Sequence, residues 1–266
     1  MWNFWRTKSI LIACALASLQ ASADPKTEPV YQRKPLSTWL KLYKNAPADS
    51  PAEAASEQAV RAIGTNAAPF LVRMLATDDL DMQSTAVNGF KILGPLGAPA
   101  VPALTTLLNG TNALLAHLAS SSLAHIGPPA LPVLLAGLTN RHYRISTDCA
   151  LAISGLGTNA RPAIPVFLHD LQQPNHLLRE RAADALGTLR IEPELVVPAL
   201  TNLLDDPSPS ARYLALSSLG RFESAARSAV PAISRLLDDQ DEVIRKAATN
   251  AVRQIAPELL TDKSDR

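Results

Sequence analysis

Cysteine is scarce in this chain, which has only Cys14 and Cys149 among its 266 residues. Cys14 lies in an N-terminal segment that we expect to be removed, so the remaining chain would have one cysteine and no disulfide. Aromatic residues make up only 5% of the sequence, whereas hydrophobic residues of all kinds make up 47%. Small and aliphatic side chains must therefore form the core, and packing alone must supply the stability.

The chain also has no large excess of charge of either sign, since its formal net charge is +1. Removing the first 23 residues takes away Arg6 and Lys8, which leaves a net charge of about −1. Proteins that bind nucleic acid along its phosphates need many unpaired basic side chains. We therefore expect no nucleic-acid partner.

What the sequence does have is an internal repeat. A proline is followed 24 residues later by an apolar residue six times, in the pairs Pro69 and Leu93, Pro102 and Ile126, Pro132 and Leu156, Pro165 and Leu189, Pro198 and Phe222, and Pro231 and Ile255. Links of six or nine residues join the units. Fixed units joined by short links are typical of a solenoid.

Each unit has the pattern of two helices. The proline suits the first turn of a short helix, because its missing N–H would be unpaired there. A polar turn follows, and then an apolar stripe with spacings of four, four and three residues predicts a second helix. One position of that stripe is always small, which predicts close contact between helices: Ala86, Ala119, Cys149, Ala182, Ala215 and Ala248. Glycines follow the last apolar residue as predicted helix caps at Gly64, Gly94, Gly127 and Gly157.

The predicted fold is all-α: a right-handed α-solenoid, an α-α superhelix of the ARM/HEAT-like kind, built of stacked helical hairpins. We divide the chain into a signal peptide (1–23), an extended segment (24–34), a starter hairpin (35–68), six repeats (69–256) and a charged C-terminal tail that frays (257–266).

The first 23 residues resemble an export signal. Arg6 and Lys8 precede an apolar run from Ile10 to Leu19, and Ala21-Ser22-Ala23 is a small-x-small cleavage pattern before Asp24. We expect a periplasmic or extracellular protein with no transmembrane segment in the mature chain. Leu11-Ile12-Ala13-Cys14 resembles a lipobox, so the alternative is a lipoprotein anchored through Cys14.

The units resemble HEAT repeats, in particular the short-helix PBS lyase HEAT-like repeats. Asp205-Asp206 with Arg212, and Asp238-Asp239 with Arg245, match the acidic turn and helix-borne arginine of that family. The resemblance implies a ladder of ion pairs between successive repeats. Arg179 keeps the arginine but earlier copies lose it, so we expect the ladder only in the C-terminal half. Residues 31–40 also resemble the opening of exported bacterial HEAT-repeat proteins.

Catalytic and metal-binding patterns are missing. HEAT-type deoxyhypusine hydroxylases bind iron through His-Glu pairs, and none of the five histidines here precedes a glutamate. His169 and His176, seven residues apart, form the most concrete candidate metal pair. Cys149 is in the column of small residues and is expected to be core. We therefore predict no enzyme activity, no cofactor and no metal, with an enzyme site assembled across several repeats as the alternative.

The exposed positions of the first helices, which line the concave side of HEAT solenoids, form the candidate binding face. These positions are mostly neutral with apolar patches, which suits a protein or peptide partner better than nucleic acid. Leu135 and Leu168 could instead only widen the core. The predicted function is a non-enzymatic scaffold for protein–protein interaction in the cell envelope, with a lipid-anchored structural role as the alternative; the sequence identifies neither the partner nor the oligomeric state. The candidate residues are Arg73, Thr105, Thr106, Leu135, Leu168, His169, Thr201, Asn202, Ser234 and Arg235.

Overall fold

The computed structural model describes residues 27–140 and 142–261. Contacts between Cα atoms divide the chain into two compact units, which meet in the sequence between Ala152 and Ile153. Unit 1 ends at Ala152 and unit 2 begins at Ile153, and each unit is described by itself. The predicted signal peptide, with Cys14 and the cleavage position before Asp24, lies outside the described residues.

The described part of unit 1 begins with a small antiparallel hairpin. Strand β1 (Val30–Tyr31) pairs with β2 (Lys34–Pro35), and the turn residues Gln32 and Arg33 have φ values of 47° and 62°. The indole N–H of Trp39 donates to the carbonyl oxygen of Tyr31 at 3.1 Å, which holds the hairpin against the next helix. The sequence predicted an extended segment at residues 24–34. The described part of that segment instead forms most of a β-hairpin.

The starter hairpin follows as α2 (Leu36–Asn45) and α3 (Pro51–Ile63). Ser50 caps α3 by accepting a hydrogen bond from the Glu53 N–H at 3.2 Å. The two helices pack against each other, and Leu36, Trp39 and Leu40 are buried between them and their neighbours. Both helices lie within the residues 35–68 predicted to form the starter hairpin.

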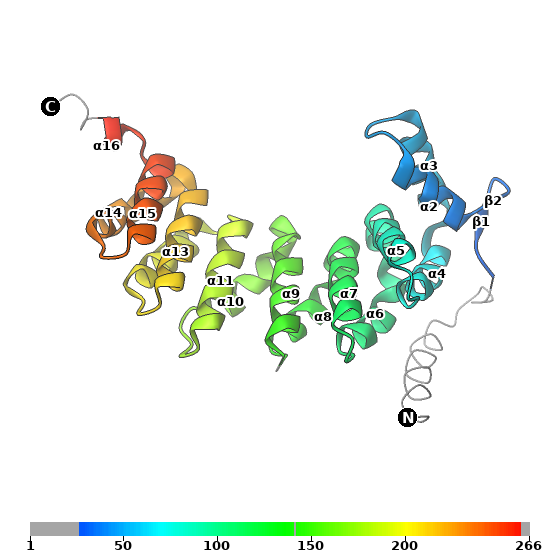
Figure 1. Ribbon diagram of the computed structural model, residues 1–266, viewed down its shortest axis with the longest axis horizontal. Helices are drawn as coiled ribbons and strands as arrows, with labels where there is room; N and C mark the ends of the chain where they lie inside the picture. The colour runs from blue at the N-terminus through cyan, green and yellow to red at the C-terminus, as the bar shows by residue number, and fades with distance from the viewer. Residues whose placement is uncertain (1–26, 141, 262–266) are drawn as a thin grey trace. The chain divides into compact units, whose positions relative to one another are not determined.

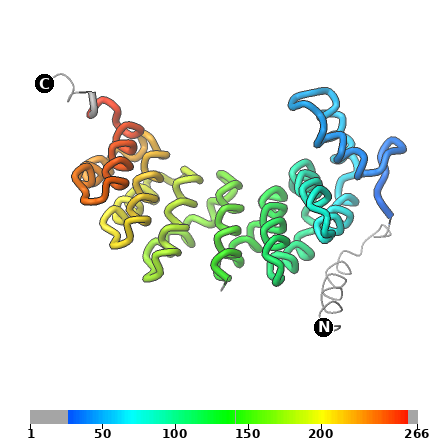
Figure 2. The backbone as a smooth tube through the Cα atoms, in the orientation of Figure 1, coloured from blue at the N-terminus to red at the C-terminus, as the bar shows by residue number. Residues whose placement is uncertain are grey.

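Six helical hairpins follow, each made of a first helix and a second helix. The first helices are α4 (Ala67–Leu75), α6 (Val101–Leu108), α8 (Leu131–Leu138), α10 (Ile164–Asp170), α12 (Pro193–Asn202) and α14 (Val230–Arg235). The second helices are α5 (Leu80–Leu93), α7 (Ala113–Ile126), α9 (Tyr143–Ser154), α11 (His176–Leu189), α13 (Pro209–Arg221) and α15 (Glu242–Ile255). Within unit 2, α11 packs on α13 and α13 on α15, as Figures 1 and 2 show.

The two link lengths correspond to two lengths of 3-10 helix. Each six-residue link holds a three-residue 3-10 helix, Gly64–Asn66 or Pro128–Ala130. Three of the nine-residue links hold one of seven residues: Gly94–Ala100, Gly157–Ala163 and Glu223–Ala229. The predicted cap glycines Gly64, Gly94, Gly127 and Gly157 all have positive φ, between 54° and 83°.

The fourth nine-residue link corrects one prediction. Five repeat prolines stand in the first turn of their helices, but Pro198 lies inside α12, which begins five residues earlier at Pro193. Arg190 and Glu192 adopt left-handed conformations, with φ values of 49° and 54°, and bring the chain to Pro193. Because proline's fixed φ suits the first helical position, the helix starts there.

The second helices form the core of the hairpins. The six side chains of the small-residue column, including the Cys149 thiol, have 0% exposure, as predicted for positions where helices approach closely. Polar side chains cap most of these helices by accepting a backbone N–H at the start of the helix: Asp79, Asn112, Asn175, Ser208 and Asp241. The all-α fold of stacked helical hairpins is confirmed.

The predicted fraying tail begins with a short helix, α16 (Glu258–Thr261), which packs on α15. Ala256 is fully buried and its carbonyl oxygen accepts from the Leu259 N–H at 3.1 Å. Glu258 also forms an ion pair with Arg227. These contacts order residues 258–261, whereas residues 262–266 lie outside the described part of the chain.

By length and composition, the stretch Leu80–Leu108 passes as a candidate membrane span, with a mean hydropathy of 1.2. It consists of α5, the 3-10 helix Gly94–Ala100 and α6 rather than one continuous helix. Within unit 1, α5 and α6 both pack on α7, and Phe90 and Leu104 are fully buried. This packing is that of core helices.

Candidate groove between first helices of unit 2

None of the ten residues of the candidate binding face is fully buried. Arg73, Thr105, Leu135, Leu168 and Thr201 are partly exposed. Five others are exposed: Thr106, His169, Asn202, Ser234 and Arg235. All ten stand on first helices, as predicted, six of them in unit 2 and four in unit 1.

The threonine hydroxyls of this face already have partners. Those of Thr105, Thr106 and Thr201 donate to the carbonyl oxygens four residues earlier in their own helices, at 2.7, 3.2 and 2.8 Å. The guanidinium of Arg73 lies over the ring of Phe70, 5.2 Å from its centroid. These hydroxyl groups are therefore weaker candidates for donating to a ligand than side chains that have no partner.

A groove in unit 2 brings two of the predicted residues, Leu168 and Asn202, together. It lies between α10 and α12 and extends to the 3-10 helix Leu203–Asp205, with a volume of about 310 Å³. The other eight predicted residues do not line it. Its walls are formed by Leu168, Leu171, Gln172, Ala199, Asn202, Leu203, Asp205, Asp206 and Pro207.

The groove combines apolar and polar walls. Five of its nine lining residues are apolar, and the side-chain amides of Gln172 and Asn202 make no hydrogen bond to any described residue. Each amide offers both donors and an acceptor. Pockets for small molecules measure roughly 300 to 1,000 Å³, so this groove is at the small end of that range.

Two aspartates at one edge of the groove have different environments. The Asp205 carboxylate is exposed and accepts a hydrogen bond from Arg235 of the next repeat at 3.3 Å. An exposed pair of this kind contributes about 0 to 1 kcal/mol. A ligand can therefore displace Arg235 from Asp205 at a low cost in free energy. Arg235 belongs to the predicted binding face and reaches the edge of the groove from the following repeat through this hydrogen bond.

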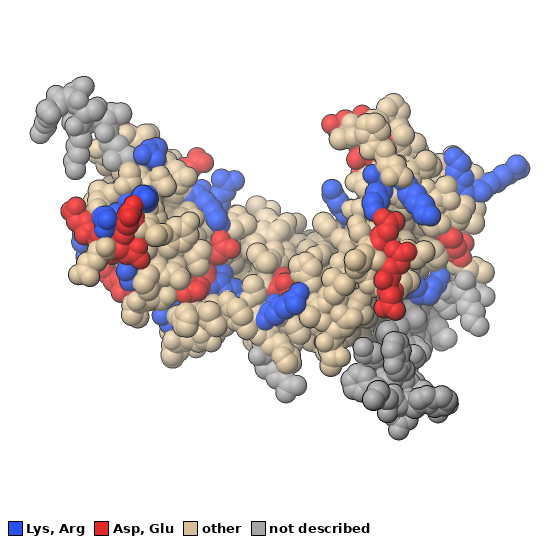
Figure 3. Space-filling model, in the orientation of Figure 1, with Lys and Arg blue, Asp and Glu red and all other residues tan. Residues whose placement is uncertain are grey.

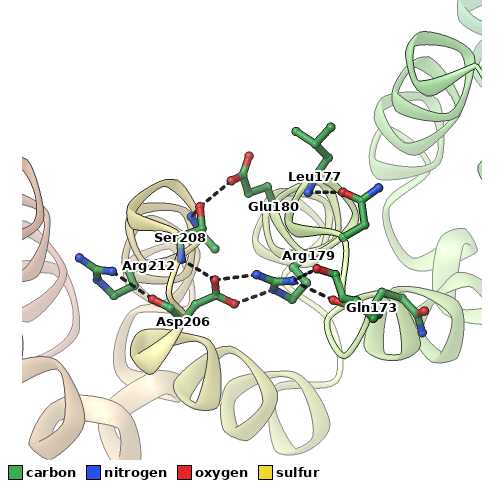
Figure 4. A network of polar contacts seen from close by, with 10 residues as sticks. Gln173, Leu177, Arg179, Glu180, Asp206, Ser208 and Arg212 are labelled. Atoms are coloured by element: carbon green, nitrogen blue, oxygen red, sulfur yellow. Dashed lines mark hydrogen bonds and ion pairs between the residues drawn. The ribbon is translucent and has the colours of Figure 1, made fainter.

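Asp206 is held much more firmly (Figure 4). Arg179 Nε and Nη2 donate to its two carboxylate oxygens at 2.6 and 2.8 Å, and the Ser208 N–H donates at 2.8 Å. Burial alone would raise the pKa of Asp206, but these hydrogen bonds and the charges of Arg179 and Arg212 outweigh it and hold the pKa below its usual value. The same hydrogen bond raises the pKa of Arg179.

This pair belongs to the ladder that the family resemblance implied. Arg179 Nη1 also donates to Gln173 O and Pro174 O, at 2.8 and 2.9 Å. Arg212 repeats the arrangement, donating to Asp206 O at 3.0 Å and lying 3.6 Å from a carboxylate oxygen of Asp239. The ladder therefore fixes the turns of unit 2, including the one that forms the groove edge.

The expectation that unit 1 lacks this ladder is confirmed for the described residues. Gln83 takes the place of the arginine, and its side-chain amide donates to Thr77 O at 2.7 Å, so it keeps the bond to the turn without the ion pair. At the other two equivalent positions, Ala116 and Ser146 have no guanidinium to offer.

Groups considered for catalysis lie apart from the groove or in the core. The ring nitrogen Nε2 of His169 lies 2.9 Å from the amide nitrogen of Gln173, and Cys149 is buried. Within residues 27–140 and 142–261, no three His, Cys, Asp or Glu side chains are arranged to hold a metal ion.

Sequence reasoning missed the polar contacts between helices outside the ladder, two of which join His117 to Asp148 and Arg181 to Asp170. His117 Nδ1 lies 3.1 Å from an Asp148 carboxylate oxygen, and Arg181 Nη2 lies 2.5 Å from Asp170 Oδ2. It also missed Gln172, Asp205 and Asp206 as groove residues, because turn residues were assigned to caps and to the ladder. The way in which a turn packs on the neighbouring repeat cannot be predicted from the sequence of one repeat alone.

Comparison with known proteins agrees with this geometry. A family model described as HEAT repeats matches residues 197–263, which hold the last two repeats. None of the curated proteins compared with the chain by sequence matches it.

Several solved structures are similar to this chain at low sequence identity. A Kap95p chain, from a structure with RanGDP, is 14% identical with a TM-score of 0.55, and the match covers 95% of this chain and 38% of that one. The CpcE–CpcF complex of phycocyanin lyase from Nostoc sp. PCC7120 is 20% identical with a TM-score of 0.49, covering 57% and 97%. A designed armadillo repeat protein in complex with the peptide (KR)4 is 15% identical with a TM-score of 0.46, covering 82% and 98%. The family model and the Kap95p match therefore show HEAT repeats over residues 197–263 and the stacked-hairpin fold of ARM/HEAT solenoids.

Proposed function

We propose that this HEAT-repeat chain is a non-enzymatic scaffold that binds a segment of a partner protein in the groove between α10 and α12. HEAT and armadillo repeat proteins generally bind proteins or peptides. The observation that carries the proposal is the groove itself, where apolar side chains lie beside the amides of Gln172 and Asn202, which make no hydrogen bond to a described residue.

The chemistry of the groove fits an extended peptide segment with one aliphatic side chain. Leu168, Leu171 and Leu203 offer apolar contact to that side chain. The amides of Gln172 and Asn202 can donate to and accept from the peptide main chain, whose polar groups need partners when they leave water. Arg179 fixes Asp206, so the turn is ordered before a partner arrives and less conformational entropy is lost on binding.

A peptide selection tests this proposal. The full chain is screened against a random peptide library, and the affinities of selected peptides are measured for the wild type, for Leu168→Asp and for a control, Tyr213→Ala. Tyr213 is exposed on second helix α13 and does not line the groove. We expect Leu168→Asp to weaken binding at least tenfold and the control to leave it unchanged. Equal loss in both variants, or no loss in either, would refute the groove as the binding site.

We further propose that the protein is exported, on the evidence of the charged and apolar N-terminal segment of the sequence. Mass spectrometry of the mature N-terminus tests this. A chain that begins at Asp24 agrees with export and cleavage. A lipidated Cys14 at the N-terminus would replace this proposal with the lipid-anchored alternative, and an intact Met1 would contradict both.

A further inference from the structure

The last copy of the ladder arginine, Arg245, has only part of the partners of the earlier copies. Its Nη1 donates to Asp239 O and Gln240 O at 2.7 and 3.0 Å, as Arg179 does to the turn before its own helix. Arg179 then binds a carboxylate through Nε and Nη2. In the described part of the chain, no carboxylate contacts those two atoms of Arg245.

The guanidinium of Arg245 is nevertheless held in place. The two carbonyl oxygens that accept from Nη1 belong to the turn before α15, and Asp239 in that turn accepts from the Asp241 N–H at 2.8 Å. The side chain is half-buried. It thus presents an ordered fork of donors, the geometry that suits bidentate binding of a carboxylate.

A shallow, open depression of about 470 Å³ lies along this fork. Its lining residues all come from α15 at spacings of three or four, so they form one stripe of the helix surface. We call this stripe the end face, and its residues are Glu242, Arg245, Lys246, Thr249, Asn250 and Arg253.

The end face is basic. It has three cations against one carboxylate, and Lys246 is already paired with Glu242 at 2.5 Å. Arg253 donates to Asn250 Oδ1 at 2.8 Å, which leaves its charge uncompensated. In Figure 3 the visible face of unit 2 shows basic side chains mixed with acidic ones around its C-terminal helices. A partner that supplies carboxylates would complement the end face in charge.

The end face also differs from the surfaces on which repeats stack. Counting 33 residues back places Thr249 and Arg253 at the positions of Leu216 and Gly220 on α13. Both α13 residues are buried, and a Cβ on Gly220 would lie 3.5 Å from Ala251 Cα of α15. A threonine and an arginine at these positions do not allow another helix to pack as closely. Helix α15 therefore has the ladder arginine, Arg245, but it does not have the apolar surface that α13 uses for stacking.

We propose that the end face docks an acidic segment of a partner protein, with one aspartate or glutamate placed on Arg245 as Asp206 is placed on Arg179. The occupant is a carboxylate-rich loop or peptide and not a further stacked repeat. This docking surface is on second helix α15 and does not include any residue of the groove between α10 and α12.

Fluorescence anisotropy with a labelled peptide of alternating aspartate and glycine tests the proposal. The same peptide with asparagine in place of aspartate is the ligand control. Arg245→Gln in the full chain should weaken binding of the acidic peptide at least tenfold. Arg161→Gln, which changes an exposed arginine elsewhere in unit 2, should leave it unchanged. Equal binding of both peptides, or no loss in Arg245→Gln, would overturn the proposal.

Two further variants separate geometry from charge and from folding. Arg245→Lys keeps the charge but loses the bidentate fork, so its affinity should also fall, and full affinity in this variant would overturn the assigned geometry. Arg253→Glu leaves Arg245 intact and reverses the charge beside it, so binding should weaken while circular dichroism shows a folded protein. In a last variant, the tail residues Asp262 and Asp265 are changed together to asparagine. Tighter peptide binding in this variant would show that the chain's own tail occupies the end face. That result would overturn docking of a partner.

Discussion

The guanidinium of Arg179 on α11 donates two hydrogen bonds, of 2.6 and 2.8 Å, to the carboxylate of Asp206 in the turn before α13. Both side chains are nearly inaccessible to solvent. Removing one partner of such a pair leaves the other as an unpaired buried charge. The pair therefore joins two successive repeats and fixes one edge of the candidate groove.

Replacing Arg179 with methionine should lower the free energy of unfolding by about 3 to 5 kcal/mol, because the Asp206 carboxylate would stay buried without its bidentate partner. Urea unfolding followed by circular dichroism measures the change. Arg235→Gln is the control, since it breaks the exposed pair with Asp205 and should cost less than about 1 kcal/mol. Equal costs in the two variants would show that burial of the pair contributes nothing.

Acid should destabilise the protein through Asp206. Its pKa in the folded chain is below the ordinary value of 3.8, so the folded state binds the proton less readily than the unfolded state. The stability that follows is fully present above about pH 4 and is lost as the pH falls through the lowered folded value. Unfolding free energies measured between pH 7 and pH 2.5 should fall more steeply with acid in the wild type than in Asp206→Asn. Identical slopes would contradict the assignment.

Gly187 on α11 is a point where a side chain has no room. A Cβ built on it would lie 2.2 Å from Ser218 Oγ and 2.7 Å from Ser218 Cα on α13, so the backbone would have to move. We expect Gly187→Ala to lower the free energy of unfolding by about 1 to 3 kcal/mol, as overpacking does. Thr188→Ala, at the exposed neighbouring position, removes only an exposed hydrogen bond from Arg221, of 2.8 Å, and should change it by less than about 1 kcal/mol. Differential scanning calorimetry of both variants measures these changes. A neutral Gly187→Ala would contradict the close packing of α11 on α13.

The sequence predicted the second helices well because their apolar stripe is a local pattern. Ala182, Ala215 and Ala248 are fully buried at the predicted positions, and the cap glycines have the expected positive φ. The start of α12 was predicted wrongly, because Pro193 offers a better first helical position than the repeat proline Pro198. Both prolines suit a first helical turn. The left-handed conformations of Arg190 and Glu192 bring the chain to Pro193, and the helix begins there.

The candidate site could be predicted only in part. Leu168 and Asn202 were found because exposure on a first helix follows from helical periodicity. Gln172 and Asp205 were not found, because their place in the groove depends on how the turn of one repeat lies against the next. That arrangement is set by the contact between Arg179 and Asp206, 27 residues apart, which the family resemblance implied as a structural ladder and not as part of a site.

Hydrogen exchange of the wild-type chain, with and without a peptide obtained by selection, tests the central claim most directly. Binding in the groove should slow amide exchange at residues 167–172 and 199–207, with no change in α4, α6 or α8 of unit 1. Leu168→Asp should abolish this protection at the same peptide concentration. Protection that falls elsewhere, or that persists unchanged in Leu168→Asp, would contradict the assignment of this groove as the binding site.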